Sequence, residues 1–457
     1  MNSTKLKASE LMKTGDEIRL KINRLGINAE GIGYFKKVIV FVEGALVGEE
    51  VIAVVTQVSD RMGFARTKKI LKRSSDRINP ECPHYASCGG CSLLHSKYPA
   101  TLDFKLDLVK QSLNKFKVNL DARKFKPTIG MDDRFNYRNK AQYQLGFRDE
   151  KVIAGLYALN SHNLIDLHDC PIQTPLINSI IEYTTEIMTE LNLRIYDERT
   201  HSGTFRSLVV RSSHTTNETQ VIFVTANKDF PSRDILIEKL KNKFPEIKSI
   251  AQNINNQRTS LVLGAETKIL YGDGYITEHL NDMEFKLSPR AFFQLNTKMA
   301  EHTYNLAINA LKLSPDMTFL DAYSGIGTLG LLVAKKVKKV FGVEIIPEAV
   351  QDAKLNAKIN HITNANYMAA AAEDLIAKFP SFDAGIVDPA RVGLDKKFIS
   401  AIINNRIKNL VYISCNPATL ARDLKLLENA YEVESMQVVD MFPNTARVEV
   451  ITKLRSK

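Results

Sequence analysis

Hydrophobic and polar positions alternate along the first part of the chain. The segments EIRLKINRLG (17–26), GIGYFKKVIVFVEG (31–44) and EEVIAVVTQV (49–58) alternate or are rich in β-branched residues, with glycines between them. This pattern is typical of short β-strands joined by tight turns. We therefore predict a small barrel of the OB type within residues 1–75, although a generic small β-domain would show the same pattern.

The middle of the chain combines one strongly periodic helix with further strand-like segments. In TLDFKLDLVKQSLNKF, the apolar residues Leu102, Leu106, Val109 and Leu113 recur at helical spacing. KAQYQLGF, SLVVRSS, QVIFVTA and TSLVLG are typical of strands, and PLINSIIEYTTEIMTEL is typical of a helix. We interpret residues 76–285 as a central β-rich domain.

The pattern changes beyond about residue 290. TFLDAYS, KVFGVEII, DAGIVDP and NLVYISC are short apolar strands, and helical segments such as TLGLLVAKKV and PEAVQDAKLNAKI separate them. Strands that alternate with helices favour a parallel sheet with crossover connections. The sequence thus predicts a Rossmann-like domain over residues 286–457, on which the helix near 102–116 can also pack.

Composition narrows the class of protein. The 457 residues carry a net charge of +11, with 44% hydrophobic and 25% charged residues, as in an ordinary globular protein. The N-terminus lacks an apolar signal-peptide core, and no apolar run reaches the ~18 residues of a membrane span. We therefore expect a cytoplasmic protein with no membrane partner. The positive charge favours a polyanionic partner, although a merely basic enzyme would carry it as well.

A glycine-rich turn follows the first strand of the predicted C-terminal domain. In DAYSGIGTLG, Gly325 and Gly327 let the backbone turn sharply near a ligand, and Glu344 ends the next strand, where it could bond ribose hydroxyls. Such a turn alone also fits a dinucleotide or a purely structural role. Asp321 disfavours a pyrophosphate but suits a cationic sulfonium, and Asp388 ends a later strand at the same edge. These features favour S-adenosylmethionine over a nicotinamide dinucleotide.

One of the five cysteines stands at the end of an apolar strand. Cys415 follows NLVYIS, and Asn416 and Pro417 can cap and begin a helix directly after it. A thiol at a helix N-terminus is favoured as the thiolate, whereas a cysteine beside apolar residues is more often buried packing. Because Cys415 lies just outside the strand, we predict that it is a nucleophile.

A thiolate beside a methyl donor suggests a definite reaction. Carbon 5 of uracil is not nucleophilic, but attack of sulfur on carbon 6 would convert the ring to an enolate that takes a methyl group at carbon 5. A base must then remove the proton left on carbon 5 so that sulfur departs. Glu449 in FPNTARVEV is the candidate, although a glutamate in an alternating strand is most often just solvated.

Together these motifs resemble those of the RNA 5-methyluridine methyltransferases, in particular the iron–sulfur branch that acts on 23S ribosomal RNA. The similarity includes a barrel like the TRAM domain, YRNKAQ, SPRAFFQLN, DAYSGIGTLG, DPAR, SCNPATLARD and FPNTARVEV, and so spans nearly the whole chain. It implies that Cys415 is the nucleophile and Glu449 the proton acceptor. The family often has a histidine two residues before that glutamate, where this chain has Arg447. The resemblance also implies an S-adenosylmethionine site lined by Gln294, Tyr323, Glu344 and Asp388.

Four cysteines remain, Cys82, Cys88, Cys91 and Cys170. Their number fits one tetrahedral zinc or one cubane iron–sulfur cluster, and spacing alone does not separate the two. The Gly-Gly pair before Cys91 and the proline after Cys170 resemble the [4Fe-4S] site of the family. We therefore expect such a cluster, with zinc as the alternative, to pin the segment near residue 82 to the segment near residue 170.

A basic strand is the expected contact with RNA. Arg138 and Lys140 alternate with polar residues and could meet phosphates, while Phe135, Tyr137 and Tyr143 could stack on unpaired bases. A solvated basic strand would show the same pattern. Because sulfur must reach carbon 6, the target base has to leave its stack.

The sequence thus predicts a monomeric enzyme that methylates carbon 5 of a uridine in 23S ribosomal RNA. The same reaction on a transfer RNA is the nearest alternative, although the family branch that acts on transfer RNA typically lacks the barrel and the cluster. An RNA-binding protein without activity is a further alternative, against which the intact motifs argue. Methylation of a protein or a small molecule is another, but it would not need a thiolate nucleophile.

Overall fold

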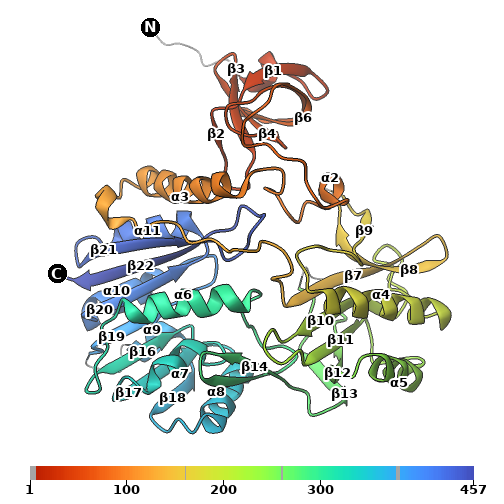
Figure 1. Ribbon diagram of the computed structural model, residues 1–457. Helices are drawn as coiled ribbons and strands as arrows, with labels where there is room; N and C mark the ends of the chain where they lie inside the picture. The colour runs from red at the N-terminus through yellow and green to blue at the C-terminus, as the bar shows by residue number, and fades with distance from the viewer. Residues whose placement is uncertain (1–6, 160, 259–260, 377–380) are drawn as a thin grey trace.

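The computed structural model describes residues 7–159, 161–258, 261–376 and 381–457. The described residues form four sheets, one of which is a two-stranded hairpin. Figure 1 shows a small barrel at the top, the central sheet at the right and the C-terminal sheet with flanking helices at the left. Helix α3 (Tyr98–Lys115) lies directly below the barrel in this view. Within the described ranges, no helix is both long and apolar enough to cross a membrane.

The N-terminal barrel is a six-stranded sheet in the order β1-β5-β6-β4-β3-β2, curled around its own apolar core. In β5, Val51, Ala53 and Val55 are buried while the residues between them are less so, as expected for strand alternation. The strands predicted in this part are therefore confirmed. The elements are α1 (Ala8–Leu11), β1 (Glu17–Lys21), β2 (Arg24–Leu25), β3 (Gly31–Phe35), β4 (Val38–Glu43), β5 (Glu50–Val58) and β6 (Met62–Lys72).

Helix α3 connects the N-terminal part of the chain to the C-terminal sheet. It follows the cysteine-bearing segment, which contains the short helix α2 (Tyr85–Cys88), and it packs against α11 (Pro417–Leu427). Phe104 and Leu108 of α3 share one apolar cluster with Leu420 of α11. The helical spacing of the apolar residues thus places one face of α3 on the C-terminal sheet.

The central sheet has seven strands in the order β13-β12-β11-β10-β7-β8-β9, with α4 and α5 packed on it. The strand predicted at TSLVLG is wrong over residues 261–264, because the side chains of Asn253 and Asn255 bond the backbone of Gly264 and Leu261 instead. The first two residues of that segment lie outside the described ranges. The elements are η1 (Ala122–Lys124), β7 (Lys140–Arg148), β8 (Lys151–Tyr157), β9 (Leu164–Asp166), α4 (Pro175–Glu190), β10 (Phe205–Ser212), β11 (Thr219–Thr225), α5 (Arg233–Lys243), β12 (Ile247–Ile254) and β13 (Glu266–Tyr271).

A hairpin of β14 (Ile276–Leu280) and β15 (Met283–Leu287) follows the central sheet. Phe285 of this hairpin lies in the same apolar cluster as α6 (Thr297–Asn309) and α7 (Thr328–Ala334). The boundary expected at residue 285 therefore falls within a strand whose core is shared with the C-terminal part.

The C-terminal sheet has the strand order β18-β17-β16-β19-β20-β22-β21, parallel from β18 to β20 and antiparallel at β22 and β21. The order reverses between β16 and β19, and ligands of open parallel sheets bind outside the carboxyl ends at such a reversal. The predicted Rossmann-like fold is confirmed. The elements are β16 (Thr318–Ala322), β17 (Lys339–Glu344), α8 (Pro347–Ile359), β18 (Ala365–Ala369), α9 (Ala372–Ile376), β19 (Ala384–Val387), α10 (Lys396–Asn405), β20 (Asn409–Ser414), β21 (Tyr431–Val439) and β22 (Glu449–Ser456).

Candidate active site

A cavity of about 2240 Å³ extends from the carboxyl edge of the C-terminal sheet to the barrel. Sites for small molecules usually measure ~300–1,000 Å³, so this cavity has room for more than a cofactor. Of the cofactor and catalytic residues predicted from the sequence, only Gly327 is absent from its wall. The wall includes Gln294, Tyr323, Gly325, Glu344, Asp388, Cys415 and Glu449.

The two glycines of the turn between β16 and α7 have different tasks. Both have left-handed backbone angles, with φ of +53° at Gly325 and +84° at Gly327, which glycine adopts at little cost. A Cβ at Gly327 would lie 2.8 Å from the ring of Tyr367, whereas a Cβ at Gly325 would meet nothing within 4 Å. Gly327 thus allows close packing behind the turn, and Gly325 leaves the cavity wall open for a ligand.

Two carboxylates fasten this turn. Glu344 accepts hydrogen bonds from the backbone N–H groups of Gly325 and Ile346, both at 3.0 Å, and remains on the cavity wall. Asp321 accepts a hydrogen bond from the N–H of Gly330 at 2.8 Å, and burial raises the pKa of Asp321 to about 7. Asp321, expected to face a cationic ligand, therefore also holds the first turn of α7 in place.

Gln294 precedes the turn in the sequence and Tyr323 belongs to it, and both residues line the cavity wall. Tyr323 has a φ of +63°, an uncommon value for a residue with a side chain, and its ring packs edge-on against Phe398 at 5.4 Å. The side chain of Gln294 hydrogen-bonds the buried hydroxyl of Tyr304. Tyr304 was not predicted from the sequence, because its helical position is also typical of an ordinary core residue.

Cys415 occupies the junction between β20 and α11 that the sequence predicts. The side chain of Asn416 caps the helix by accepting a hydrogen bond from the N–H of Ala418 at 3.1 Å. It also donates to the backbone carbonyl of Arg391 at 2.9 Å. The cap therefore ties the loop after β20 to the loop after β19, and Pro417 begins the helix.

The ionisation of Cys415 differs from the expectation. Burial, followed by the nearby carboxyl groups of Glu449 and Asp388, raises the pKa of the Cys415 thiol to about 11, although the Arg391 guanidinium and a backbone hydrogen bond oppose this. The prediction that the helix N-terminus favours the thiolate is therefore wrong for the free protein. Dehydration and negative neighbours outweigh the helix dipole, which contributes modestly.

Glu449 reaches the same place from the antiparallel side of the sheet. In the ladder between β20 and β22, Ser414 pairs with Val450, and their chain neighbours Cys415 and Glu449 both lie at this end of the ladder. Glu449 is only 3% exposed, and burial followed by the charge of Asp388 raises its pKa well above the ordinary value. Burial also raises the pKa of Asp388 to about 7. The two carboxyl groups therefore resist being ionised together.

Two arginines on the cavity wall complete the surroundings of Cys415. The pKa of Arg447 is lowered by burial and by the charge of Arg391, while Cys415 acts in the opposite direction. Arg447 stands where the resembling family often has histidine. It thus places a guanidinium, which stays charged at neutral pH, near the sulfur. Arg391 was overlooked in the DPAR motif, although an arginine at the carboxyl edge of a sheet is a recognisable anion-binding signal.

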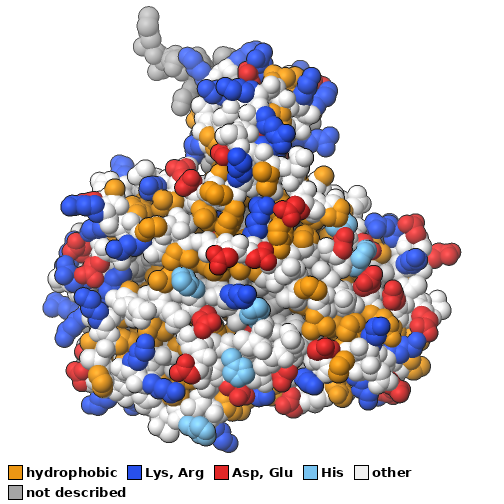
Figure 2. Space-filling view, in the orientation of Figure 1, with side chains coloured by type: hydrophobic (Ala, Val, Ile, Leu, Met, Phe, Trp, Pro, Cys, Tyr) orange, Lys and Arg blue, Asp and Glu red, His pale blue; other side chains and the backbone are white. Residues whose placement is uncertain are grey.

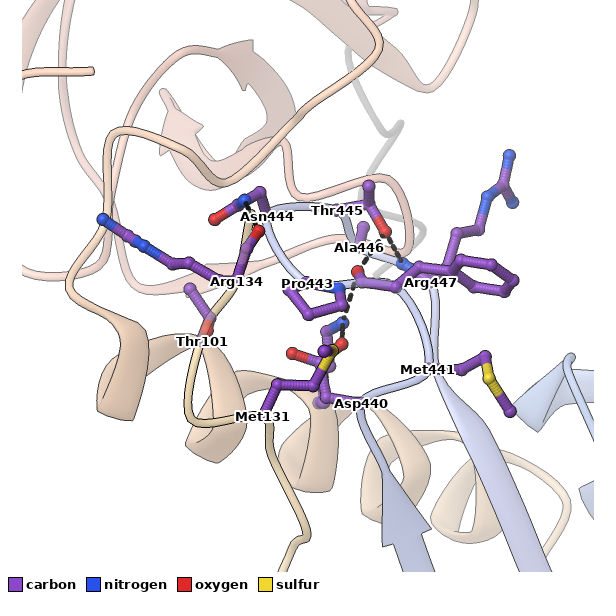
Figure 3. A network of polar contacts seen from close by, with 12 residues as sticks. Thr101, Met131, Arg134, Asp440, Met441, Pro443, Asn444, Thr445, Ala446 and Arg447 are labelled. Carbon is purple, nitrogen blue, oxygen red and sulfur yellow. Dashed lines mark hydrogen bonds and ion pairs between the residues drawn. The ribbon is translucent and has the colours of Figure 1, made fainter. Parts of the chain in front are cut away.

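The loop before Glu449 is held from the side of the cysteine-bearing segment. The N–H of Leu93 donates to the carbonyl of Asn444, and the N–H of Ala446 donates to Ser92 Oγ, both at 2.9 Å. The Asn444 side chain donates to the carbonyl of Arg134 at 2.8 Å. Figure 3 shows the side chain of Asn444 beside Arg134 on one side of the loop.

A buried ion pair lies at the base of the same loop. Lys105 of α3 and Asp440 have no exposed side-chain surface and are paired with each other. Lys105 also donates to the carbonyl of Phe442 at 3.2 Å. In Figure 3, Asp440 lies at the foot of the loop, and the side chain of Arg447 extends away from it. The loop that leads to Glu449 is thus anchored at both its start and its middle.

The four remaining cysteines are free, half-buried thiols. The pKa of Cys91 is raised to about 12 by burial and then by Cys170, Cys88 and Cys82, so the two segments do meet. In the parts of the chain that the structure describes, however, no three His, Cys, Asp or Glu side chains are arranged to hold a metal ion. The donor set suits a metal centre, but the arrangement seen here does not, and the predicted cluster gains no support from it.

The residues expected to contact RNA differ in their exposure and surroundings. Arg138 is half-buried on the cavity wall and donates to the carbonyl of Lys140 at 3.1 Å. Lys140 is half-buried as well, and burial followed by the charges of Arg211 and Arg138 lowers its pKa to about 7. The idea that Tyr137 and Tyr143 stack on bases is wrong, because they are 7% and 3% exposed. Both rings pack inside the protein instead.

A Rossmann-like sheet with a glycine-rich turn at its carboxyl edge defines the class of Rossmann-fold methyltransferases, and here a cysteine and a glutamate lie at the same edge. Residues 97–457 match the family described as tRNA (Uracil-5-)-methyltransferase, and residues 12–68 match the TRAM domain. The protein belongs to the tRNA (uracil-5-)-methyltransferase family and carries an N-terminal TRAM domain.

Relatives and a solved structure agree with this assignment. The chain is 48% identical to an uncharacterized RNA methyltransferase of Enterococcus faecalis, over 98% of this chain and 99% of the relative. It is 45% identical to another from Halalkalibacterium halodurans, over 99% of each. The fold is similar to that of the Pyrococcus abyssi tRNA (uracil-54, C5)-methyltransferase in complex with S-adenosyl-L-homocysteine, with 28% identity and a TM-score of 0.76. That similarity covers 95% of this chain and 99% of the other.

Proposed function

We propose that this enzyme transfers a methyl group from S-adenosylmethionine to carbon 5 of a uridine in RNA, with Cys415 as nucleophile and Glu449 as proton acceptor. The observation that carries the proposal is the position of these two residues directly beside the Ser414–Val450 pair of β20 and β22, on the wall of the cavity that contains Gly325 and Glu344. The complex of the P. abyssi enzyme with S-adenosyl-L-homocysteine supports the choice of cofactor.

The residues of the chain divide the reaction between them. The cofactor supplies an electrophilic methyl group when bound. Cys415 gives up its proton to solvent and its sulfur bonds to carbon 6, which moves the ring electrons toward the carbonyl at carbon 4. Carbon 5 then takes the methyl group, whose bond to the sulfonium sulfur breaks. Glu449 removes the proton from carbon 5, the carbon–sulfur bond breaks, and the double bond is restored. A raised pKa makes the ionised Glu449 a stronger base for that last step.

Two variants test these roles. Cys415→Ala should lose methyl transfer by at least roughly 10³-fold, because the variant lacks the sulfur that activates carbon 5 in this mechanism. Glu449→Gln should instead accumulate a covalent RNA–protein adduct, visible as a shifted band on denaturing gels with radiolabelled RNA. The exposed Glu428→Gln is the matched control and should behave as the wild type. Full activity of Cys415→Ala would eliminate the covalent route.

The proposed substrate is a uridine of 23S ribosomal RNA, reached with the barrel as an RNA-binding module. The quartet of Cys82, Cys88, Cys91 and Cys170, which resembles the ribosomal branch, supports this choice. Transfer RNA is the second candidate, because the similar P. abyssi enzyme is described as acting on a tRNA and its match covers 95% of this chain. The barrel alone therefore does not separate the two RNAs.

Mapping of 5-methyluridine by mass spectrometry separates the two candidates. The modification should disappear from 23S ribosomal RNA, and not from transfer RNA, in cells without the gene, and it should return with the wild-type gene but not with the Cys415→Ala gene. Loss of 5-methyluridine from transfer RNA alone would replace the first candidate with the second.

The four non-catalytic cysteines complete the proposal as ligands of one [4Fe-4S] cluster, with zinc as the alternative occupant. Their chemistry and their origin in two segments that meet, around Cys82 to Cys91 and at Cys170, support a structural centre. Anaerobically purified protein should contain about four iron and four sulfide per chain. Cys82→Ser should lose the iron, whereas the matched Cys415→Ser should keep it. Stoichiometric zinc without iron would support the alternative.

A further inference from the structure

The outer face of the barrel carries two aromatic rings that its folding does not use. Val40 and Val42 of β4 and Ala65 of β6 are buried in the barrel core, so strand alternation turns Phe41 and Phe64 outward. Both rings are half-exposed, and neither belongs to an apolar cluster of the described residues. The outer face of a small barrel is normally polar, so this pair requires another explanation.

Phe41 and Phe64 together form what we call the aromatic platform. They are direct neighbours in the parallel ladder between β4 and β6. Their ring centroids are 5.5 Å apart, and their planes are inclined by only 19°. Nearly parallel rings on adjacent strands present a continuous apolar surface, and such surfaces bind nucleobases because every base has a flat π-face.

Groups that suit a nucleic-acid backbone lie beside the aromatic platform. Arg66 follows Phe64 by two positions on the same face, is exposed, and has no ion-pair partner among the described residues. Lys68 continues the same strand, and Gln57 lies opposite Phe64 on β5. All of them line the same cavity. Figure 2 shows many Lys and Arg side chains on the barrel, so the rings stand in positive surroundings that a polyanion would neutralise.

The aromatic platform is continuous with the candidate active site. Phe41 and Phe64 lie on the wall of the cavity that also contains Cys415 and Glu449. A ligand that extends from the catalytic edge toward the barrel would therefore reach the rings. The cavity volume of about 2240 Å³ exceeds what a cofactor and one base need, which fits a strand of several nucleotides.

We propose that the aromatic platform stacks an unpaired nucleobase of the RNA substrate, outside the catalytic edge, while Arg66 contacts a neighbouring phosphate. This inference rests on the proposed function in so far as the ligand is RNA. The barrel then binds exposed bases directly and also supplies positive charge. Stacking tolerates any base, so the aromatic platform contributes affinity and placement rather than sequence preference.

Binding of a single-stranded probe tests the aromatic platform without requiring methyl transfer. The probe is a fluorescein-labelled oligouridylate of 12 nucleotides, and the full-length protein is titrated by fluorescence anisotropy at fixed salt. The double variant Phe41→Ala/Phe64→Ala should raise the Kd roughly tenfold, because stacking on aromatic side chains contributes that much per base. The matched control is Tyr34→Ala, an exposed aromatic of the same barrel that is not on the cavity wall, and it should stay within twofold.

A second probe separates stacking from other effects of the rings. An oligomer of the same length without bases keeps every phosphate, so wild type and double variant should bind it equally. Should the alanine variant not fold, Phe41→Leu/Phe64→Leu keeps apolar bulk without a π-face and should show the same loss on the oligouridylate. Unchanged oligouridylate affinity, or a loss that persists on the abasic probe, would overturn the inference.

Photochemical crosslinking locates the contact. An oligomer containing 4-thiouridine should crosslink to the tryptic peptides 38–61 and 62–66, which contain the two rings, and Tyr34→Ala should crosslink as the wild type does. Crosslinks confined to other peptides would contradict the inference. Because neither measurement involves Cys415, both remain informative even if the mapping of 5-methyluridine contradicts the proposed function.

Discussion

An ion pair beneath the catalytic loop and an ion pair on the barrel differ in their surroundings, although their chemistry is the same. Lys105 and Asp440 are fully buried, whereas the side chains of Lys68 and Glu17 are 54% and 50% exposed. A buried charge that loses its partner stays uncompensated in a poorly polarisable interior, whereas water screens an exposed pair. The catalytic region is therefore held by contacts that are costly to lose, and the barrel face by contacts that can rearrange around a ligand.

The largest change in the free energy of unfolding is expected when the buried ion pair of Lys105 and Asp440 is broken. Lys105→Met leaves the carboxylate of Asp440 without its cation, and Asp440 Oδ2 already has no hydrogen-bond partner among the described residues. The free energy of unfolding should fall by about 3–5 kcal/mol, measured by urea denaturation. The exposed Lys115→Met on the same helix is the control and should cost less than ~0.5 kcal/mol.

A double variant shows whether the loss comes from the uncompensated charge. Lys105→Met/Asp440→Leu removes both charges and should recover most of the stability, because an apolar pair of similar size pays no desolvation penalty. If the double variant were less stable than Lys105→Met alone, the pair would be needed for its packing rather than its charge, and the contrast with the barrel would lose its basis.

The next largest change in the free energy of unfolding is expected at Asp388, and here the substitution should stabilise the protein. Burial raises the pKa of Asp388 to about 7, whereas an aspartate in the unfolded chain titrates near ~3.9. Between these two values the unfolded state releases its proton while the folded state keeps it. Stability is therefore lost as pH rises from about 4 to about 7, and the loss persists at higher pH. An ionisable group that is retained although it lowers the stability of the fold is typical of a functional site.

Asp388→Asn should remove this cost. At pH 8 the variant should be more stable than the wild type by roughly 2–4 kcal/mol, and at pH 4 the two should be nearly equal. Urea denaturation at both values measures the difference, with the exposed Asp103→Asn as a control expected to change stability by less than ~0.5 kcal/mol. Equal gains at both values would show that ionisation of Asp388 is not the cause.

Much of the candidate site follows from local patterns in the sequence. Asp388 and Cys415 each end an apolar strand, and parallel strands bring their carboxyl ends to one edge, so the sequence alone predicted that they would meet. The glycine-rich turn was also recognisable, because it too follows an apolar strand at that edge. The secondary structure of the C-terminal sheet was equally predictable from the sequence, because buried parallel strands appear as short apolar runs between amphipathic helices.

What the sequence did not reveal depends on contacts between distant segments. The burial of Glu449 results from the pairing of β22 with β20. Tyr143 is buried by the packing of the central sheet, and the buried Tyr137 donates a hydrogen bond to the distant carbonyl of Pro443. The direction of the pKa shift at Cys415 was missed because it depends first on burial and then on carboxyl groups from two other segments of the chain. Local motifs thus predict where chemistry gathers, but the charge state at that place is a property of the assembled fold.

A smaller effect is expected at the thiol itself. Burial and two carboxyl groups raise the pKa of Cys415 to about 11, so its alkylation by iodoacetamide should accelerate about tenfold per pH unit from pH 7 to pH 9 without a plateau. Arg391→Gln removes the cation that opposes the shift and should slow alkylation about threefold at each pH. Mass spectrometry of the tryptic peptide 409–422 measures the rate, and the exposed Arg199→Gln is the control. A plateau below pH 9 would mean that the carboxyl groups do not govern the thiol.

The smallest change in stability is expected at the exposed ion pair of Lys68 and Glu17 on the barrel. The same substitution should nevertheless change RNA binding. Lys68→Ala breaks the contact with Glu17, yet the free energy of unfolding should change by less than ~1 kcal/mol, because water screens the pair. The same variant should reduce the salt dependence of oligouridylate binding by about one phosphate contact, since Lys68 lines the cavity beside the aromatic platform. A stability loss as large as that of Lys105→Met would show that the barrel is as rigidly held as the catalytic loop. An unchanged salt slope would remove Lys68 from the RNA path while leaving the stacking by Phe41 and Phe64 to be judged on its own probes.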